Sequence, residues 1–306
     1  MKNTTTTIIR CREGVQRCGL RTVPRAAFTL VEVMVVMTLL SFIVIALMGV
    51  FNSTQAAFRA SLTQTDVLES GRAAMNLITG DLRAMSPSLG GSNGAVNFYA
   101  GNNSVQLGSG ATPLIQPLIA SSKSRTNVLQ NFFILSRENQ TWTGTGYFVN
   151  PTATNAINPL YRFSMSMSAA AFNSPAQLYT NYINIALTNQ QYWSRLVDGV
   201  VTLRVRAYDL NGVWMTNGYF TPPSALIKNV RFAPADWGEV GFTIYSNALP
   251  AAVEIELATL EDRTLQRAES RPMGPLRNQY LAEQSSKVHI FRQRVAIPNV
   301  DPAAYP

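Results

Sequence analysis

The stretch from Phe28 to Phe51 constrains the fold of this chain most strongly, because it is 24 residues long, mostly apolar, and contains a single charged group. As a helix it would measure about 36 Å, which is enough to cross a hydrocarbon core of roughly 30 Å. The charged group is Glu32, and the next charged residue is Arg59. A charge inside a membrane span costs about 3 kcal/mol on insertion scales, so we expect the Glu32 carboxylate to pair with a partner.

The residues before this stretch, 1–27, indicate a targeting segment rather than part of the fold. They hold six of the 25 Lys and Arg residues and one of the 17 Asp and Glu residues, so their removal lowers the formal net charge from +8 to +3. Both cysteines, Cys11 and Cys18, also lie there, which leaves the rest of the chain without a disulfide or thiol chemistry. The positive-inside rule places residues 1–27 in the cytoplasm and the chain after Phe51 across the membrane.

The hexapeptide Ala27-Phe28-Thr29-Leu30-Val31-Glu32 resembles the cleavage and methylation motif of type IV prepilins and type II secretion pseudopilins. The resemblance implies that prepilin peptidase cuts between Ala27 and Phe28 and that the new amino group of Phe28 is methylated. Glu32 would then neutralise the α-amine of a neighbouring subunit in a filament. Thr29 and Leu30 complete the motif, whereas Ala27 stands where the family nearly always has Gly. A plain signal anchor is the alternative, but it leaves Glu32 unexplained.

Helical periodicity continues beyond the apolar stretch, at mostly three- and four-residue steps that mark one face of an amphipathic helix. The residues in these steps are Phe58, Leu62, Leu68, Met75, Ile78, Leu82 and Met85. Pro87 should end the helix, so we expect one helix from about Phe28 to about Met85. Gly71 and Gly80 each cost about 1 kcal/mol relative to Ala in a helix, and each is interpreted as a bend or a close packing site.

The remaining chain has β-like segments separated by Gly, Pro, Asn and Ser clusters, after a turn-rich linker at 86–97. Alternation with period two predicts strands most clearly at 200–209, 252–260 and 288–297. Asn211-Gly212 predicts a hairpin turn, and broken alternation near Phe291 predicts a bulge. Residues 261–287 are expected to form a loop or a short helix. The weaker strand candidates are 96–100, 132–136, 146–149, 161–167 and 182–187.

Together these segments predict an α+β fold, in which a long N-terminal helix packs on a β-rich, pilin-like globular domain. We expect a leader at 1–27, a membrane-spanning half of the helix at 28–51, an amphipathic half at 52–86 and a globular domain at 87–306. The strand order of 196–299 also resembles the C-terminal half of J-type minor pseudopilins and W-type minor pilins. The same comparison relates 88–195 to no family.

Residues that would carry enzyme chemistry are scarce, so no catalytic residue, metal or cofactor is predicted. The single histidine, His289, lies within a predicted strand, and the sequence has no nucleophile elbow, P-loop or dinucleotide fingerprint. Glu254 and Glu256 alternate on one strand and are interpreted as a solvated face, with a calcium site built from distant loops as the alternative. The scattered tryptophans Trp142, Trp193, Trp214 and Trp237 are interpreted as core or rim residues.

Nucleic acid is not favoured as a partner, because a net charge of +3 is weak for DNA and acidic residues interleave with the basic ones. The basic surface considered for it comprises Arg204, Arg206, Arg263, Arg267, Arg271, Arg292 and Arg294.

The chain is therefore interpreted as a structural subunit, a minor pseudopilin or minor pilin at or near a filament tip. It would be anchored in the inner membrane with its C-terminal domain in the periplasm. Expected partners are prepilin peptidase, other subunits of the filament, the inner-membrane assembly platform and membrane lipid. The alternatives are a pilus-tip adhesin or DNA-uptake subunit that binds a ligand through 88–195, and a signal-anchored periplasmic enzyme.

Overall fold

A computed structural model describes residues 29–89, 95–102, 113–118, 123–149, 157–171, 174–184, 190–216, 229–233 and 237–304. The chain divides into two units, one up to Arg59 and one from Ala60 onward. The predicted cleavage site at Ala27 and Phe28 and the whole predicted leader, 1–27, lie outside the described residues.

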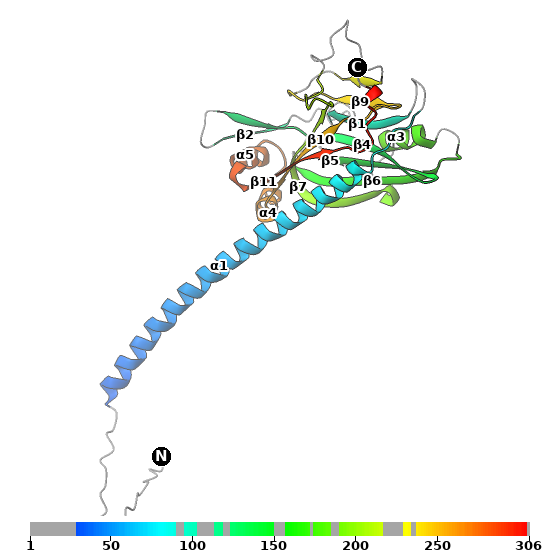
Figure 1. Cartoon of the computed structure of the whole chain (residues 1–306). Helices are drawn as coiled ribbons and strands as arrows, with labels where there is room; N and C mark the ends of the chain where they lie inside the picture. The colour runs from blue at the N-terminus through cyan, green and yellow to red at the C-terminus, as the bar shows by residue number, and fades with distance from the viewer. Residues whose placement is uncertain are drawn as a thin grey trace, which may run out of the picture. The chain divides into compact units, whose positions relative to one another are not determined.

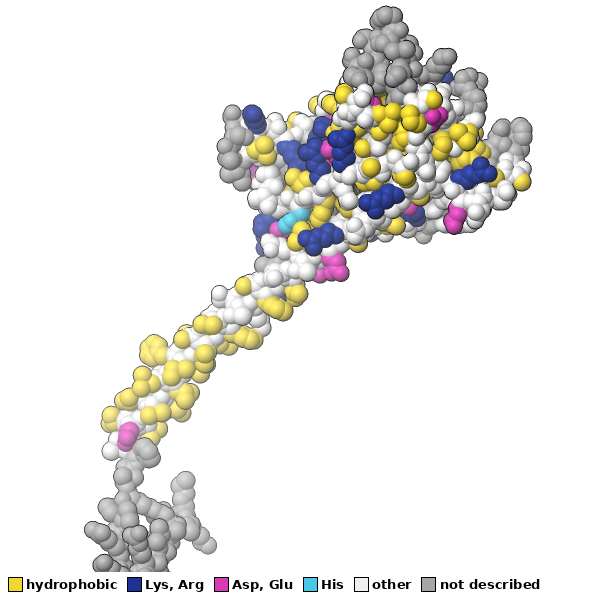
Figure 2. All heavy atoms as spheres, viewed as in Figure 1, with side chains coloured by type: hydrophobic (Ala, Val, Ile, Leu, Met, Phe, Trp, Pro, Cys, Tyr) yellow, Lys and Arg dark blue, Asp and Glu magenta, His cyan; other side chains and the backbone are white. Residues whose placement is uncertain are grey.

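Helix α1 (Leu30–Arg83) is the long N-terminal helix that the sequence predicts. In the first unit its apolar side chains are exposed, from Leu30 through Phe51 and on to Phe58. Figure 2 shows yellow hydrophobic side chains along this part of the helix, interspersed with white backbone and other side chains. The helix ends two residues before Met85, which forms an isolated bridge with Ser136, so the chain leaves the helix directly into contact with the sheet.

The globular unit is built on a nine-stranded antiparallel sheet in the order β11-β10-β7-β6-β5-β4-β1-β9-β8 (Figure 1). A separate hairpin pairs β2 with β3. The strands are β1 (Val96–Asn102), β2 (Leu114–Pro117), β3 (Ser124–Asn127), β4 (Gln130–Glu138), β5 (Thr141–Val149), β6 (Asn158–Ser168), β7 (Trp193–Tyr208), β8 (Val230–Phe232), β9 (Phe242–Tyr245), β10 (Ala252–Leu260) and β11 (Val288–Ala296).

One face of the sheet packs against the second half of α1 and forms the main core. The helix contributes Ala74, Met75, Ile78 and Leu82, all nearly or fully buried. Because directly opposed residues of antiparallel strands share a face, Leu203, Leu257 and Phe291 line this same side.

Gly71 is a close packing site, because a Cβ atom there would lie 2.2 Å from the Phe291 ring. Gly80 has no atom within 4 Å of such a Cβ. The sequence allowed a bend or a close packing site at each of these glycines. The structure has a close packing site at Gly71, against Phe291, but not at Gly80.

A partly buried ion pair attaches the last turns of α1 to β5 and β6. Arg162 donates from Nε and from its terminal nitrogen to the Asp81 carboxylate, at 2.9 and 3.1 Å, and the Tyr147 hydroxyl donates to the same carboxylate. Burial, followed by the charge of Asp81, raises the pKa of Tyr147. Burial alone would lower the pKa of Arg162, but the hydrogen bonds and charge of Asp81 outweigh it and raise the pKa.

The opposite face of β4–β6 is covered by α3 (Ser174–Asn184) and an aromatic cluster. Glycines on β5 let α3 approach the strand backbone, since a Cβ at Gly146 would lie 2.2 Å from the Tyr182 ring. Tyr182 donates its hydroxyl hydrogen to the Tyr147 carbonyl at 3.0 Å. Trp142 and Trp193 pack in or against this cluster, which confirms their interpretation as core residues.

Two short helices, α4 (Asp262–Glu269) and α5 (Pro275–Glu283), follow β10 and form a smaller core with Val201, Leu260 and Leu281. They occupy most of the segment 261–287, where a loop or one short helix was expected. The remaining short helical turns are η1 (Gln190–Tyr192), η2 (Ser285–Lys287) and η3 (Pro302–Ala304).

The sequence predictions hold for most of the sheet and are wrong in two places. The segment predicted as a strand at 182–187 begins inside α3, and its last three residues lie outside the described residues. The bulge predicted near Phe291 is absent, because β10 and β11 pair without interruption from Ala252↔Ala296 to Leu260↔Val288. The strand candidate at 96–100 is confirmed as β1, which begins at Val96 and overlaps the end of the predicted linker, whereas β7 starts seven residues earlier than expected.

Candidate functional site

The start of α1 carries the motif residues that the structure describes. The Glu32 amide donates to Thr29 Oγ1 at 3.3 Å, and the Val33 amide donates to the Thr29 carbonyl at 3.2 Å. Thr29 therefore has the contacts of a helix N-cap, and the spacing Thr-x-x-Glu is that of a capping box. The motif thus fixes where the helix begins, at Leu30, directly after the Thr29 cap.

Glu32 lies in the first turn of α1, where the helix dipole favours a negative charge. Its side chain is exposed and surrounded by exposed apolar residues. Within residues 29–59 the carboxylate has no ion pair or side-chain hydrogen bond. An unpaired charge of this kind is costly in lipid, so the carboxylate needs a partner from outside this part of the chain.

The hydroxyl groups between Leu30 and Phe51 differ from Glu32, because both are satisfied internally. Thr38 and Ser41 donate to backbone carbonyls three and four residues earlier, at 2.9 and 2.8 Å, and Thr54, just beyond this stretch, does the same at 2.8 Å. Such bonds let hydroxyls enter a membrane without an unsatisfied donor. Among the described polar side chains of this segment, Glu32 is accordingly the one best suited to act between molecules.

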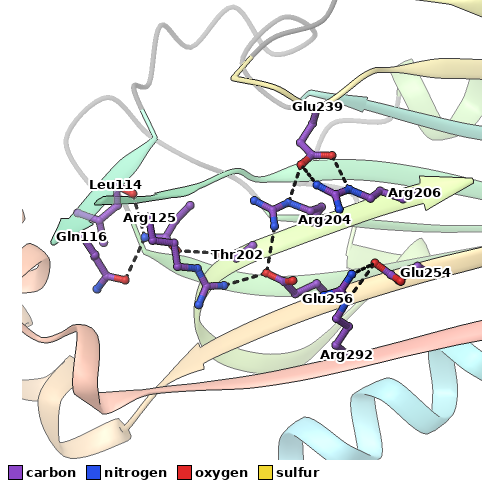
Figure 3. A network of polar contacts seen from close by, with 11 residues as sticks. Leu114, Gln116, Arg125, Thr202, Arg204, Arg206, Glu239, Glu254, Glu256 and Arg292 are labelled. Atoms are coloured by element: carbon purple, nitrogen blue, oxygen red, sulfur yellow. Dashed lines mark hydrogen bonds and ion pairs between the residues drawn. The ribbon is translucent and has the colours of Figure 1, made fainter. Parts of the chain in front are cut away.

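Three arginines of the basic surface considered for nucleic acid, Arg204, Arg206 and Arg292, pair with carboxylates on the sheet face opposite α1 (Figure 3). Arg206 binds Glu239 at 2.6 and 3.0 Å, and Arg204 contacts Glu239 at 2.9 Å and Glu256 at 3.3 Å. Arg125 binds the same Glu256 at 2.9 Å. The hydrogen bond to Glu239 raises the pKa of Arg206, ahead of the opposing effect of burial.

Glu254 and Glu256 do not form a solvated face, which corrects the interpretation from sequence. Their side chains are only 13% and 12% exposed, and Glu254 binds Arg292 at 2.6 Å. Glu239 was missed altogether, because it is distant in sequence from Arg204 and Arg206 and only the tertiary fold brings these residues together.

No catalytic arrangement is found around His289 in the described part of the chain. His289 lies on β11 with Nε2 3.5 Å from Glu261 Oε1, and the residue directly opposite it on β10 is the buried Thr259. The described residues also contain no group of three or more His, Cys, Asp or Glu side chains able to hold a metal ion. Trp214 stacks under Arg206 at 4.6 Å, and Trp237 is half exposed.

Comparison with known proteins matches the start of the chain to one family model. The prokaryotic N-terminal methylation motif matches residues 24–48, a range that includes Ala27, Phe28 and Glu32. No curated protein matched the chain. Helix α1 is also the described helix that is long and apolar enough to cross a membrane. The motif and the helix together support a type IV prepilin-like precursor with an inner-membrane anchor, a family whose members are structural subunits.

Proposed function

We propose that this protein is a minor pseudopilin or minor pilin, a structural subunit of a type II secretion pseudopilus or a type IV pilus. The observation that carries the proposal is the methylation motif at residues 24–48. It is supported by the position of Glu32 in an apolar helix segment in which the hydroxyls of Thr38 and Ser41 are internally satisfied. In this role the protein performs no catalysis. The protein inserts into the inner membrane, is processed at its N-terminus and assembles into a filament.

Processing removes residues 1–27 through cleavage by prepilin peptidase between Ala27 and Phe28, and Phe28 is then methylated. The basic leader stays in the cytoplasm by the positive-inside rule. Residues 28–51 cross the inner membrane, 52–86 continue the helix, and 87–306 fold in the periplasm. Thr29, the second residue of the mature chain, caps the helix.

Assembly pairs the Glu32 carboxylate with the α-amine of a neighbouring subunit. In a medium of low dielectric constant, opposite charges attract strongly, and leaving either one unpaired is heavily penalised. A subunit therefore lowers its free energy when it moves to the axial position at which the two groups meet. Exposed apolar residues along the helix, from Leu30 to Phe51, supply the remaining contacts with lipid and with other helices.

The globular domain follows the helix during assembly, because the second half of α1 is part of the domain core. Ile78 and Leu82 are fully buried, and Asp81 binds Arg162 on β6. A position at or near the filament tip rests on the resemblance of 196–299 to J-type minor pseudopilins. The size of the domain at 87–306 also favours a minor subunit over a major one.

The experiment that tests this function is the replacement Glu32→Gln in the native filament system. Glutamine keeps the shape of the side chain but carries no charge, so membrane insertion and leader cleavage should proceed while incorporation into filaments is impaired. Glu69→Gln is the matched control, because Glu69 is an exposed carboxylate on the same helix outside the apolar stretch. Normal incorporation of the Glu32→Gln protein would contradict the charge-pairing mechanism.

A further inference from the structure

Strand β11 forms one edge of the nine-stranded sheet and pairs only with β10 within that sheet. It is nine residues long, contains no proline and has no bulge against β10. The strand at the other edge, β8, has three residues. Long, flat edges are the ones that accept an added strand, so β11 is the edge suited to it.

The hydrogen-bond register shows which backbone groups of β11 point outward. Ile297 donates to the Ala251 carbonyl and Glu261 donates to the Lys287 carbonyl, so odd-numbered residues at this edge bond toward β10. In an antiparallel pair, the residues between them direct their N–H and C=O groups to the other side. Those residues are Ile290, Arg292, Arg294 and Ala296.

The side chains along this edge are basic. Arg292 is 55% exposed and binds Glu254 through a single oxygen. Arg294 is exposed and stacks on Tyr208 at 3.8 Å, and Arg72 of α1 is exposed nearby. For Arg72 and Arg294, no carboxylate of the described chain lies within ion-pair distance. Figure 2 shows Lys and Arg side chains gathered on the visible face of the globular domain.

These charges disfavour pairing with a second copy of the same edge. An antiparallel pair of two β11 strands centred on Gln293 would place Arg292 of one copy opposite Arg294 of the other, and like charges in that position are destabilising. An incoming strand with carboxylates at alternate positions would instead meet Arg292 and Arg294 with opposite charge.

A hollow beside the edge has room for the side chains on the other face of an added strand. It has a volume of about 320 Å³ and lies between α1 and β11, where it is lined by Arg72, Met75, Asn76, Phe291, Arg292 and Gln293. This hollow suits a strand that alternates acidic and apolar residues, because Met75 and Phe291 offer apolar contacts and Arg72 offers a positive charge.

We propose that the free edge of β11 binds an extended acidic segment of another protein chain as an additional strand. Main-chain hydrogen bonds to the outward groups supply affinity, and the arginines and the hollow select the sequence. The inference names a kind of partner and holds whether or not the chain assembles into a filament.

The test uses the full-length protein in detergent and a synthetic peptide, acetyl-Thr-Glu-Val-Glu-Val-Glu-Thr-amide. Backbone hydrogen exchange is measured at single residues by mass spectrometry. Without peptide, the amides of Ile290, Arg292 and Arg294 should exchange fast and those of Phe291 and Gln293 slowly. Peptide should protect the first set and leave the second unchanged. Slow exchange of the first set without peptide would show that the edge is covered and would overturn the proposal.

Two modifications separate strand addition from simple charge attraction. Arg294→Pro removes an outward N–H and should weaken peptide binding by about tenfold, which corresponds to about 1.4 kcal/mol, whereas Arg294→Ala keeps the N–H and should weaken it less. Because proline can disturb folding, the peptide is also N-methylated at all Glu or at all Val residues. Only alternate N–H groups of an added strand point toward β11. The peptide methylated at those positions should fail to bind, and the other peptide should bind.

Three results would contradict the proposal. Equal binding of the two methylated peptides would exclude strand pairing. Equal binding of a peptide with Lys in place of Glu would exclude recognition of acidic sequence. Protection that grows with protein concentration in the absence of peptide would show that a second copy occupies the edge.

Discussion

Gly71 and Gly80 of α1 test how the helix packs on the sheet, because both are helical but their surroundings differ. Replacement of either by alanine should favour the helix by about 1 kcal/mol. At Gly80 the new methyl group meets nothing within 4 Å, whereas at Gly71 it would lie 2.2 Å from the Phe291 ring. We therefore expect opposite effects on the free energy of unfolding.

The size of the effect follows from the contact with Phe291. Forcing a methyl group into packed space costs about 1–3 kcal/mol, which exceeds or cancels the gain in helix propensity. Gly80→Ala should thus stabilise the protein by about 1 kcal/mol, while Gly71→Ala should be neutral or destabilising by up to about 2 kcal/mol. Both replacements gain the same helix propensity. The difference of about 2 kcal/mol between their free energies of unfolding therefore measures the steric strain at Gly71.

Thermal unfolding of the full-length protein in detergent, followed by near-ultraviolet circular dichroism, measures the difference. A gap of about 2 kcal/mol corresponds to roughly 4–8 °C in Tm for a domain of this size. The control is the same pair of variants in a Phe291→Ala background, where both glycine replacements should stabilise alike. Equal stabilisation by Gly71→Ala and Gly80→Ala in the native background would refute the close contact.

Three further predictions concern charged groups of the globular domain. Asp81→Asn should lower the free energy of unfolding by about 2 kcal/mol, because the charge-assisted hydrogen bonds with Arg162 are lost; urea titration measures it. By the same assay, Glu239→Gln should cost about 3 kcal/mol, since two half-buried arginines share this 4% exposed carboxylate. Arg292→Ala should cost under about 1 kcal/mol, because Arg292 is exposed in its pair with Glu254. Similar costs for Glu239→Gln and Arg292→Ala would contradict the role of burial. Burial, followed by two nearby aspartates, raises the pKa of Asp262 above 3.8. The stability that Asp262 contributes is therefore present below pH 3.8 and is lost as the pH rises through the raised pKa. The Asp262→Asn protein should gain stability relative to the native protein as the pH rises over that range. A difference in stability that does not change with pH would contradict the raised pKa.

Much of the fold follows from local patterns in the sequence. The apolar run and the three- and four-residue steps predict α1, because a helix buries one face in the core and exposes the rest to lipid or water. The alternation of buried and polar residues predicts β7, β10 and β11 for the corresponding reason in a sheet. These patterns are strong because each element contacts the core along most of its length.

The errors arise where tertiary contacts override local patterns. Tyr182 and Ile183 look like strand residues, yet the glycines of β5 leave space for a helix to bury Tyr182 against the sheet. The alternation near Phe291 breaks in sequence because the preceding residue, Ile290, is apolar but 53% exposed on the other face, while the strand itself remains regular. Local periodicity carries no signal for a helix contact or for an exposed apolar side chain.

The candidate site divides in the same way. Thr29 and Glu32 are adjacent in sequence, so a short motif is sufficient to identify them, and the structure adds the N-cap hydrogen bond. Glu239, in contrast, meets Arg204 and Arg206 only after the sheet has formed. The sequence interpretation of Glu254 and Glu256 as solvated failed because alternation shows which face a side chain occupies, but not what covers that face.

The most direct test of the proposed function is mass spectrometry of the tagged protein, gently purified from detergent-solubilised membranes, to read both its N-terminus and its bound partners. We expect a mature chain that begins at methylated Phe28 and carries other proteins with the same N-terminal motif. The identity of those partners would separate a secretion pseudopilus from a pilus. An uncut chain that begins at Met1 and has no such partners would contradict the proposal that the protein is a processed filament subunit.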